Sequence, residues 1–357
     1  MKIAQVSPLY EAVPPRLYGG TERVVAYLSD ALVAAGHEVT LFASADAHTR
    51  AKLVPTRDQA IRLDPAELKS DLAAHLSMLH EVRRRMDEFD VIHFHVDMVH
   101  YPFFDDCAER TLTTLHGRLD LKDLAGVYRR WPQFPLVSIS HRQREPLRSA
   151  HWIGTVYHGL PGDLCPFVPE GRGGYLAFLG RISPEKRVDR AIEIAQRAGL
   201  PLRIAAKVDP VDRPYFTDCI EPLLSKPDVE YVGEISDEAK GEFLGNAIAL
   251  LFPIDWPEPF GLVMIEAMSC GTPVIAWRRG SVPEVLDDPA SGRMVDDVDG
   301  AVAAVREAIG LDRRAVRKVF ERRYTASIMA SNYVNLYRRL CVAEVGDTAV
   351  ASGQLSS

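Results

Sequence analysis

The chain has 357 residues, with 42 basic and 49 acidic side chains and a formal net charge of −7. This length exceeds what one hydrophobic core usually organises, so two domains are expected, and a content of 47% hydrophobic and 25% charged residues excludes wholesale disorder. The acidic balance excludes a surface that binds nucleic acid or anionic lipid throughout, and the five scattered cysteines exclude a disulfide framework or a zinc site.

The first half of the chain alternates short β-branched runs with amphipathic stretches, a pattern typical of a parallel sheet covered by helices. A helix is expected at 21–35 and ends at Gly36, because glycine suits the position that follows a helix C-terminus. Strands are predicted at 2–6, 38–42, 91–95, 111–115, 136–139 and 155–157.

The second half repeats this pattern after a stretch at 161–174 that is rich in proline and glycine and is the predicted linker. Its first helix is expected at 184–198, with Pro184 near the start, where the missing N–H costs nothing. Strands are predicted at 175–179, 202–206, 229–232, 249–252 and 273–276.

The end of the chain predicts a long helix followed by a polar tail. The helix is expected at 326–341, because Met329, Tyr333, Leu336 and Leu340 form one apolar face. The tail at 345–357 is expected to be flexible.

Two doubly wound α/β domains place their ligands at the carboxyl ends of the strands, so we expect a cleft between the domains with the chemistry in those loops. The sequence WPEPFGLVMIEAMSCGTP at 256–273 leaves one such strand and enters a helix near Gly261. The free N–H groups of a first helical turn favour an anion such as phosphate. Glu258 and Glu266 would then reach different parts of one ligand, a sugar ring and a ribose. The alternative is that Glu258 caps the helix and Glu266 is solvated.

A second glycine turn, FLGRISPEKRVD at 178–189, places Arg181 and Lys186 beside a helix start. Two cations there would neutralise a diphosphate, including one that departs as a leaving group. The alternative is an ordinary set of helix-surface ion pairs.

A third turn, LYGGTER at 17–23, puts Gly19 and Gly20 before a helix, with Thr21 as a candidate N-cap. It lacks the GxGxxG pattern of a dinucleotide site, which counts against a nicotinamide-dependent oxidoreductase.

Histidines also occur at predicted strand ends. His116 follows the strand at 111–115 and could offer its imidazole to a ligand hydroxyl, or could bond a nearby backbone carbonyl. His93 and His95 share one strand face and precede Asp97, but without a third ligand of matched spacing we favour a structural role over a metal site.

Taken together, these motifs resemble the retaining GT-B glycosyltransferases of glycosyltransferase family 4, the glycogen-synthase-like group 1 enzymes. The resemblance covers nearly the whole chain and rests on four pieces in order. These are GGTERV at 19–24, LHG at 115–117, FLGRISPEK at 178–186, and the E-x7-E spacing of Glu258 and Glu266.

The resemblance implies a GT-B fold, in which two Rossmann-like doubly wound domains enclose an interdomain cleft. It implies an acceptor-side domain at 1–165, joined by a C-terminal helix at about 324–341, and a domain at 166–323 that binds the nucleotide-sugar donor.

The resemblance also implies roles for individual residues. Arg181 and Lys186 would hold the donor diphosphate, Glu258 would meet the hexose and stabilise charge, and His116 would reach the transferred sugar near its 6-hydroxyl. Glu266 would accept the ribose hydroxyls. The implied donor-binding residues are Gly19, Gly20, Phe260, Gly261, Leu262, Val263 and Glu266.

The implied reaction moves a hexose from a nucleoside-diphosphate sugar, with UDP favoured over GDP and ADP, to an acceptor hydroxyl with retention. It uses neither a metal nor a cofactor, and needs no enzymic nucleophile if the leaving phosphate oxygen takes the acceptor proton. Two alternatives stay open: a nucleotide-sugar epimerase of the same architecture and a non-catalytic nucleotide-sugar binding protein. The chain departs from the family pattern at His158, where asparagine is common, and at Arg187, where glycine is common.

Residues 110–151 carry eight basic and three acidic side chains. Such an excess would suit an acidic or lipid-linked glycan acceptor or an anionic membrane, and a solvated basic face is the alternative. The N-terminus lacks the pattern of a signal peptide and no run is long enough to span a bilayer. We therefore expect a cytoplasmic protein that is at most peripheral at the inner membrane face and has no nucleic-acid partner.

Overall fold

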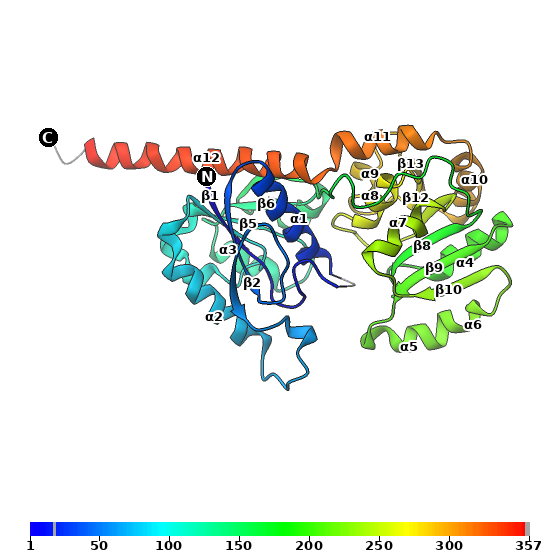
Figure 1. Ribbon diagram of the computed structural model, residues 1–357, viewed down its shortest axis with the longest axis horizontal. Helices are drawn as coiled ribbons and strands as arrows, with labels where there is room; N and C mark the ends of the chain where they lie inside the picture. The colour runs from blue at the N-terminus through cyan, green and yellow to red at the C-terminus, as the bar shows by residue number, and fades with distance from the viewer. Residues whose placement is uncertain (17–18, 354–357) are drawn as a thin grey trace. The chain divides into compact units, whose positions relative to one another are not determined.

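The computed structural model describes residues 1–16 and 19–353, with side chains as far as residue 342. The chain forms two compact units, one made of Met1–Gly159 together with the chain from Ala326 on, the other of Leu160–Thr325. Each unit is built around one parallel sheet (Figure 1). The division lies before Leu160 rather than at residue 165, because the Leu160 N–H donates to the Tyr324 carbonyl at 2.9 Å and so ties the start of the linker to the second unit.

The first unit holds a seven-stranded sheet in the order β3-β2-β1-β4-β5-β6-β7. β1 lies centrally, with Ala4 paired to Thr40 of β2 on one side and to Ile92 of β4 on the other. Its strands are β1 (Lys2–Val6), β2 (Glu38–Ser44), β3 (Lys52–Arg57), β4 (Val91–Phe94), β5 (Thr111–Thr114), β6 (Leu136–Ser138) and β7 (Trp152–Thr155).

Two strands of this sheet differ from the prediction. β7 lies at Trp152–Thr155 rather than at 155–157, and β3 was not predicted. β3 is a half-exposed edge strand that contains Pro55, so it lacks the continuous apolar run of a buried parallel strand.

The helices of the first unit are α1 (Gly20–Ala34), α2 (Asp71–Arg84), α3 (Leu124–Arg130) and α12 (Ala326–Gly353). α1 begins at Gly20 with Gly19 at its N-cap, so the prediction that Thr21 caps this helix is wrong. Gly36 follows the helix with φ +85°, the left-handed conformation that favours glycine.

The long C-terminal helix α12 contacts α1 and β4 within the first unit (Figure 1). Tyr333 and Tyr337 are completely buried there. A Cβ atom on Gly154 of β7 would lie 2.8 Å from Leu336 Cδ1, so the missing side chain at Gly154 lets α12 approach the sheet. The helix continues through residue 353, beyond the expected end at 341, and therefore includes much of the predicted tail; residues 354–357 lie outside the described part.

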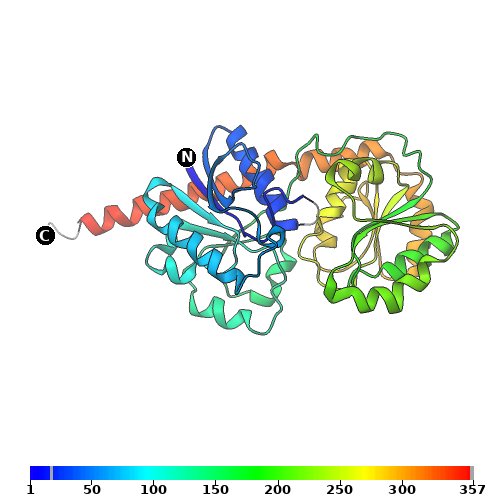
Figure 2. The same ribbon diagram turned by 60° about the horizontal axis from the view of Figure 1, so that its bottom comes forward.

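The second unit holds a six-stranded sheet in the order β10-β9-β8-β11-β12-β13, with helices on both of its faces (Figure 2). Its strands are β8 (Leu176–Arg181), β9 (Leu202–Lys207), β10 (Val229–Gly233), β11 (Ala249–Phe252), β12 (Val274–Trp277) and β13 (Gly292–Val295). Its helices are α4 (Val188–Ala198), α5 (Arg213–Tyr215), α6 (Glu221–Leu224), α7 (Asp237–Gly245), α8 (Leu262–Ser269), α9 (Val282–Val285), α10 (Val298–Ala308) and α11 (Arg313–Arg323).

The start of α4 corrects the prediction of a helix from 184. Pro184 lies in a turn in which the Lys186 N–H donates to the Ser183 carbonyl at 3.1 Å. Arg187 then adopts φ 56° and ψ 53°, a left-handed conformation that interrupts the helical path, so α4 begins at Val188. Lys186 therefore lies in a loop and not in the first turn of a helix.

Each sheet has one switch point, the place where the strand order changes from one side of the first strand to the other. It lies between β1 and β4 in the first unit and between β8 and β11 in the second. Ligands of open α/β sheets bind at the carboxyl ends of strands at such points. No helix in the described part of the chain is long and apolar enough to cross a bilayer.

Candidate active site

The loops that follow β8 and β11 meet at the switch point of the second sheet. Lys186, from the β8 loop, forms an ion pair with Glu258 Oε2, from the β11 loop. The indole Nε1 of Trp256 donates to the same Oε2 at 2.9 Å, and Lys186 Nζ lies 4.8 Å from the Trp256 ring centroid. Both charged side chains are largely buried, with exposed fractions of 15% for Lys186 and 10% for Glu258. The structure thus pairs two residues that the sequence placed 72 positions apart.

The β11–α8 loop is fixed by close backbone packing. The Ser281 N–H donates to the Glu258 carbonyl at 2.9 Å, and the Ser281 hydroxyl donates to the Phe260 carbonyl at 2.8 Å. A Cβ atom on Gly280 would lie 2.3 Å from the Glu258 carbonyl oxygen, so only glycine fits there. Gly261, with φ 81°, turns the chain into α8, whose first turn presents the backbone N–H groups at Leu262 and Val263.

Glu266 lies on α8 and is 5% exposed, which excludes the alternative of a solvated helical glutamate. Its Oε1 lies 3.0 Å from Lys240 Nζ, and Lys240 also contacts Asp237 at 2.9 Å. Lys240 lies on α7 and was not predicted as a site residue, since nothing in its local sequence distinguishes it from a surface lysine.

Arg181 ends β8 and is surrounded by carboxylates. It contacts Glu185 at 2.5 Å, Asp209 at 3.4 Å and Asp212 at 3.4 Å. Burial raises the pKa of Asp212. Arg181 and Lys186 therefore have separate partners, and the positive charge of Arg181 is balanced by Glu185 of the β8 loop and by Asp209 and Asp212 of the loop after β9.

The first unit has a pocket of about 500 Å³ at the carboxyl ends of β1, β4 and β5. Gly19, Gly20 and His116, three of the predicted site residues, line it. Glu22 and Asp97 line it as well, and loss of hydration raises the pKa of Glu22 to about 7 and that of Asp97 to about 6.

His116 belongs to a buried chain of hydrogen bonds. Its Nε2 lies 2.8 Å from His95 Nδ1, and His95 Nε2 lies 2.8 Å from Gln5 Oε1. A carbonyl oxygen only accepts, so His95 donates through Nε2 and accepts from His116 Nε2–H. The partner of His116 is thus another imidazole rather than the backbone carbonyl that the alternative prediction gave. Burial lowers the pKa of His116 to about 3 and keeps the ring neutral.

The chain of hydrogen bonds continues to α12. His93 Nδ1 lies 2.8 Å from the Tyr337 hydroxyl, and His93 Nε2 lies 2.7 Å from Thr114 Oγ1, which lies 2.9 Å from the Tyr333 hydroxyl. These contacts give His93 a structural role. Across the described residues, no group of three or more His, Cys, Asp or Glu is arranged to hold a metal ion.

Comparison with known proteins matches each unit to a glycosyltransferase family model. Residues 18–153 match the model of Glycosyltransferase Family 4, and residues 169–320 match that of Glycosyl transferases group 1. The phosphatidyl-myo-inositol mannosyltransferase of Mycolicibacterium smegmatis is 26% identical over 97% of this chain and 95% of its own length. These matches support a group 1 glycosyltransferase that is similar to family 4.

Solved structures agree with this assignment. AviGT4, a glycosyltransferase involved in avilamycin A biosynthesis, is 25% identical, covers 96% of this chain and 98% of its own, and superposes with a TM-score of 0.71. Anabaena HepE in complex with UDP-glucose shares the fold at 15% identity, covering 95% of this chain and 100% of its own, with a TM-score of 0.70. The predicted GT-B architecture of two parallel-sheet α/β units is confirmed.

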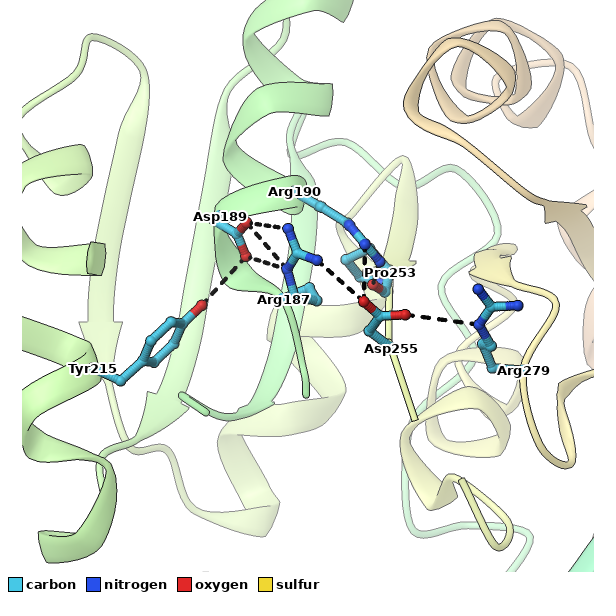
Figure 3. Close-up of polar contacts among 7 residues, drawn as sticks. All are labelled: Arg187, Asp189, Arg190, Tyr215, Pro253, Asp255 and Arg279. Carbon is cyan, nitrogen blue, oxygen red and sulfur yellow. Dashed lines mark hydrogen bonds and ion pairs between the residues drawn. The ribbon is translucent and has the colours of Figure 1, made fainter. Parts of the chain in front are cut away.

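In this glycosyltransferase the residue after Lys186 in the β8 loop is Arg187. Arg187 binds Asp189 through two nitrogens, at 2.6 Å and 2.9 Å, and reaches Asp255 at 3.3 Å (Figure 3). The Asp189 carboxylate raises the pKa of Arg187. Arg190, at 3.0 Å, and Arg279, at 3.8 Å, also contact Asp255.

The basic residues of 110–151 are partly neutralised by nearby carboxylates. Arg110 pairs with Asp87 at 3.0 Å, Arg118 with Asp120 at 2.7 Å, and Arg142 with Glu145 at 2.8 Å. Asp120 and Glu145 are two of the three acidic residues within the segment, so only Asp87 adds a negative charge from outside it.

Proposed function

We propose that this glycosyltransferase transfers a hexose from a UDP-sugar to an acceptor hydroxyl with retention at the anomeric carbon. The observation that carries the proposal is the buried pair of Lys186 and Glu258 at the switch point of the second sheet. Burying two charges costs desolvation energy that their attraction does not always repay, so a buried pair at the ligand-binding edge of a sheet favours a functional role over a purely stabilising one. Glu258 stands four residues before Leu262, the start of α8, where backbone N–H groups favour phosphate.

In this proposal Glu258 binds the sugar and Lys186 binds the diphosphate. The contacts from Lys186 and Trp256 both go to Oε2 of Glu258, so Oε1 is available to accept from hexose hydroxyls. An ammonium group has three N–H donors, so Lys186 can hold Glu258 and a phosphate oxygen together. Glu266, held by Lys240 at 3.0 Å, accepts the ribose hydroxyls.

The reaction exchanges one bond for another at the anomeric carbon. The bond from this carbon to the diphosphate oxygen breaks, and its electron pair goes to the diphosphate. The acceptor oxygen bonds the same carbon from the same face, and its proton passes to the leaving oxygen. Lys186 and the start of α8 stabilise the negative charge on the diphosphate, which is the main contribution of the enzyme to the rate.

The proposed donor base is uracil. It is supported by Anabaena HepE, a protein of the same fold that holds UDP-glucose in its crystal structure. A thermal-shift series with UDP-, GDP- and ADP-sugars tests the base, because a ligand that binds the folded chain raises its melting temperature. A shift with GDP- or ADP-sugars alone would refute the uridine assignment.

The acceptor is proposed to bind in the pocket of the first unit through hydroxyl groups. Glu22, Asp71 and Asp97 contribute carboxyl groups to this pocket, whereas its arginine, Arg62, is paired with Glu11 at 2.9 Å. Such a lining favours a hydroxyl-rich glycan over a polyanion, since unpaired like charges repel.

The test of the reaction is a transfer assay with Lys186→Ala. Transfer is expected to fall by at least about 100-fold, as for other residues that stabilise a leaving group. Lys226→Ala is the matched control, because Lys226 contacts Gln196 at 3.0 Å and is not part of the loops described above. Unchanged turnover in Lys186→Ala would refute the role of Lys186, and an inverted anomer in the product, seen by NMR, would refute retention.

The same assay separates transfer from epimerisation. The donor is incubated without acceptor and its sugar is analysed. A transferase leaves the sugar configuration unchanged, whereas the appearance of an epimer would favour the alternative of a nucleotide-sugar epimerase.

A further inference from the structure

The loops that carry Lys186 and Glu258 are joined next to the ion pair by a second set of contacts. The Asp255 N–H donates to the Glu185 carbonyl at 2.8 Å, which is a direct backbone link between the two loops. Figure 3 shows the side chains around this link, with Arg187 between Asp189 and Asp255.

Arg187 adopts a backbone conformation that is unfavourable for any residue with a Cβ atom. Its φ of 56° lies in the left-handed region, where glycine is favoured. Strained residues persist where the surrounding structure holds them in place, and they cluster at functional sites. The side chain of Arg187 must therefore provide contacts that glycine could not.

Those contacts extend in two directions from one guanidinium group. One edge binds Asp189 on α4, which is also bonded by the Tyr215 hydroxyl at 3.3 Å. The other end reaches Asp255 in the β11 loop, three residues before Glu258. Arg190 Nη2 holds the same Asp255 oxygen at 3.0 Å.

We propose that Arg187 is a positioning residue that fixes the β8 loop against the β11 loop and so sets the position of Lys186 relative to Glu258. A planar guanidinium suits this role because it can engage two carboxylates with defined geometry, whereas an ammonium group lacks this fixed fork. The consequence for ligand binding rests on the proposed donor-binding function of Lys186 and Glu258.

Hydrogen–deuterium exchange tests the link between the loops without any substrate. In Arg187→Gly, exchange of the Asp255 amide is expected to rise by about tenfold or more, because local opening becomes easier. Asp228→Gly is the matched control: Asp228 also has a positive φ, of 61°, but is not in these loops, so its replacement leaves exchange at Asp255 unchanged. Unchanged exchange in Arg187→Gly would overturn the proposal.

Calorimetry with UDP distinguishes positioning from direct contact with the diphosphate. Asp255→Asn removes the negative charge that Arg187 binds but keeps the Arg187 cation. Positioning predicts that Arg187→Gly and Asp255→Asn each weaken UDP binding by about tenfold, and that the double variant is no weaker than either one, as for residues acting through one contact. Weakening in Arg187→Gly alone, with Asp255→Asn binding as well as the parent or better, would assign Arg187 a direct contact and overturn the positioning role.

The exchange measurement and the calorimetry together distinguish a failure of this proposal from a failure of the proposed function. If the parent protein binds no UDP, the donor assignment fails while the exchange measurement still decides whether Arg187 links the loops. If the parent binds UDP and the exchange at Asp255 is unaffected by Arg187→Gly, the donor assignment stands and the positioning role fails.

Discussion

Glu22 provides a quantitative test of the electrostatics of the first unit. Its side chain is 5% exposed on α1, and burial raises its pKa from 4.5 to about 7. Because the folded pKa is raised, the contribution of Glu22 to stability is fully present below pH 4.5 and is lost as the pH rises through about 7. Each pKa unit corresponds to about 1.36 kcal/mol, so the complete loss is about 3 kcal/mol and roughly 2.5 kcal/mol of it falls between pH 5 and 8.

The perturbation is Glu22→Gln, which keeps the shape of the side chain and removes the ionisation. We compare the unfolding free energies of the parent and the variant at each pH. Their difference, parent minus variant, is expected to decrease by about 2.5 kcal/mol between pH 5 and pH 8. The assay is native-state hydrogen exchange of the buried α1 amides, corrected for intrinsic exchange rates. It measures the unfolding free energy of the first unit separately from that of the second.

The parent and Glu22→Gln contain the same buried histidines, so the contribution of these histidines to the pH dependence of stability cancels in the difference. Glu38→Gln is the control for the chemical change itself, since Glu38 is exposed at the start of β2 and does not line the pocket. Parallel pH profiles for the parent and Glu22→Gln would show that Glu22 ionises normally in the folded chain and would refute the reasoning.

Three further substitutions test individual contacts. Tyr337→Phe removes the hydroxyl that lies 2.8 Å from His93 Nδ1, so the unfolding free energy should fall by about 1–3 kcal/mol in chemical denaturation, and an unchanged value would contradict the buried network. Gly280→Ala forces a Cβ atom against the Glu258 carbonyl and should lower transfer by about 100-fold, and full activity would show that this loop tolerates displacement. Arg313→Met leaves three backbone carbonyls and a threonine hydroxyl without their donor, which should cost about 3 kcal/mol in the unfolding of the second unit; a loss below about 1 kcal/mol would argue against those bonds.

Much of the fold follows from local sequence. The strands β1 and β11 have the bounds that their apolar runs predicted, and α1 differs by one residue at each end. These elements are strongly periodic or continuously apolar, so local pattern and tertiary packing favour the same structure. The start of α4 was mispredicted, since the Ser-Pro-Glu-Lys sequence favours a helix start while the left-handed backbone of Arg187 prevents one.

The sequence determined by itself that the chain has two α/β halves. It also predicted that the chemistry lies in glycine-containing loops after the strands, with Glu258, Glu266, Arg181 and Lys186 as the charged candidates there. Only the tertiary structure decided how these charges are paired. Lys186 binds Glu258, Lys240 binds Glu266, and acidic residues enclose Arg181. The physical reason is that a motif records residue type and spacing along the chain, whereas the partner of a buried charge is set by strand order, which brings β8 and β11 side by side.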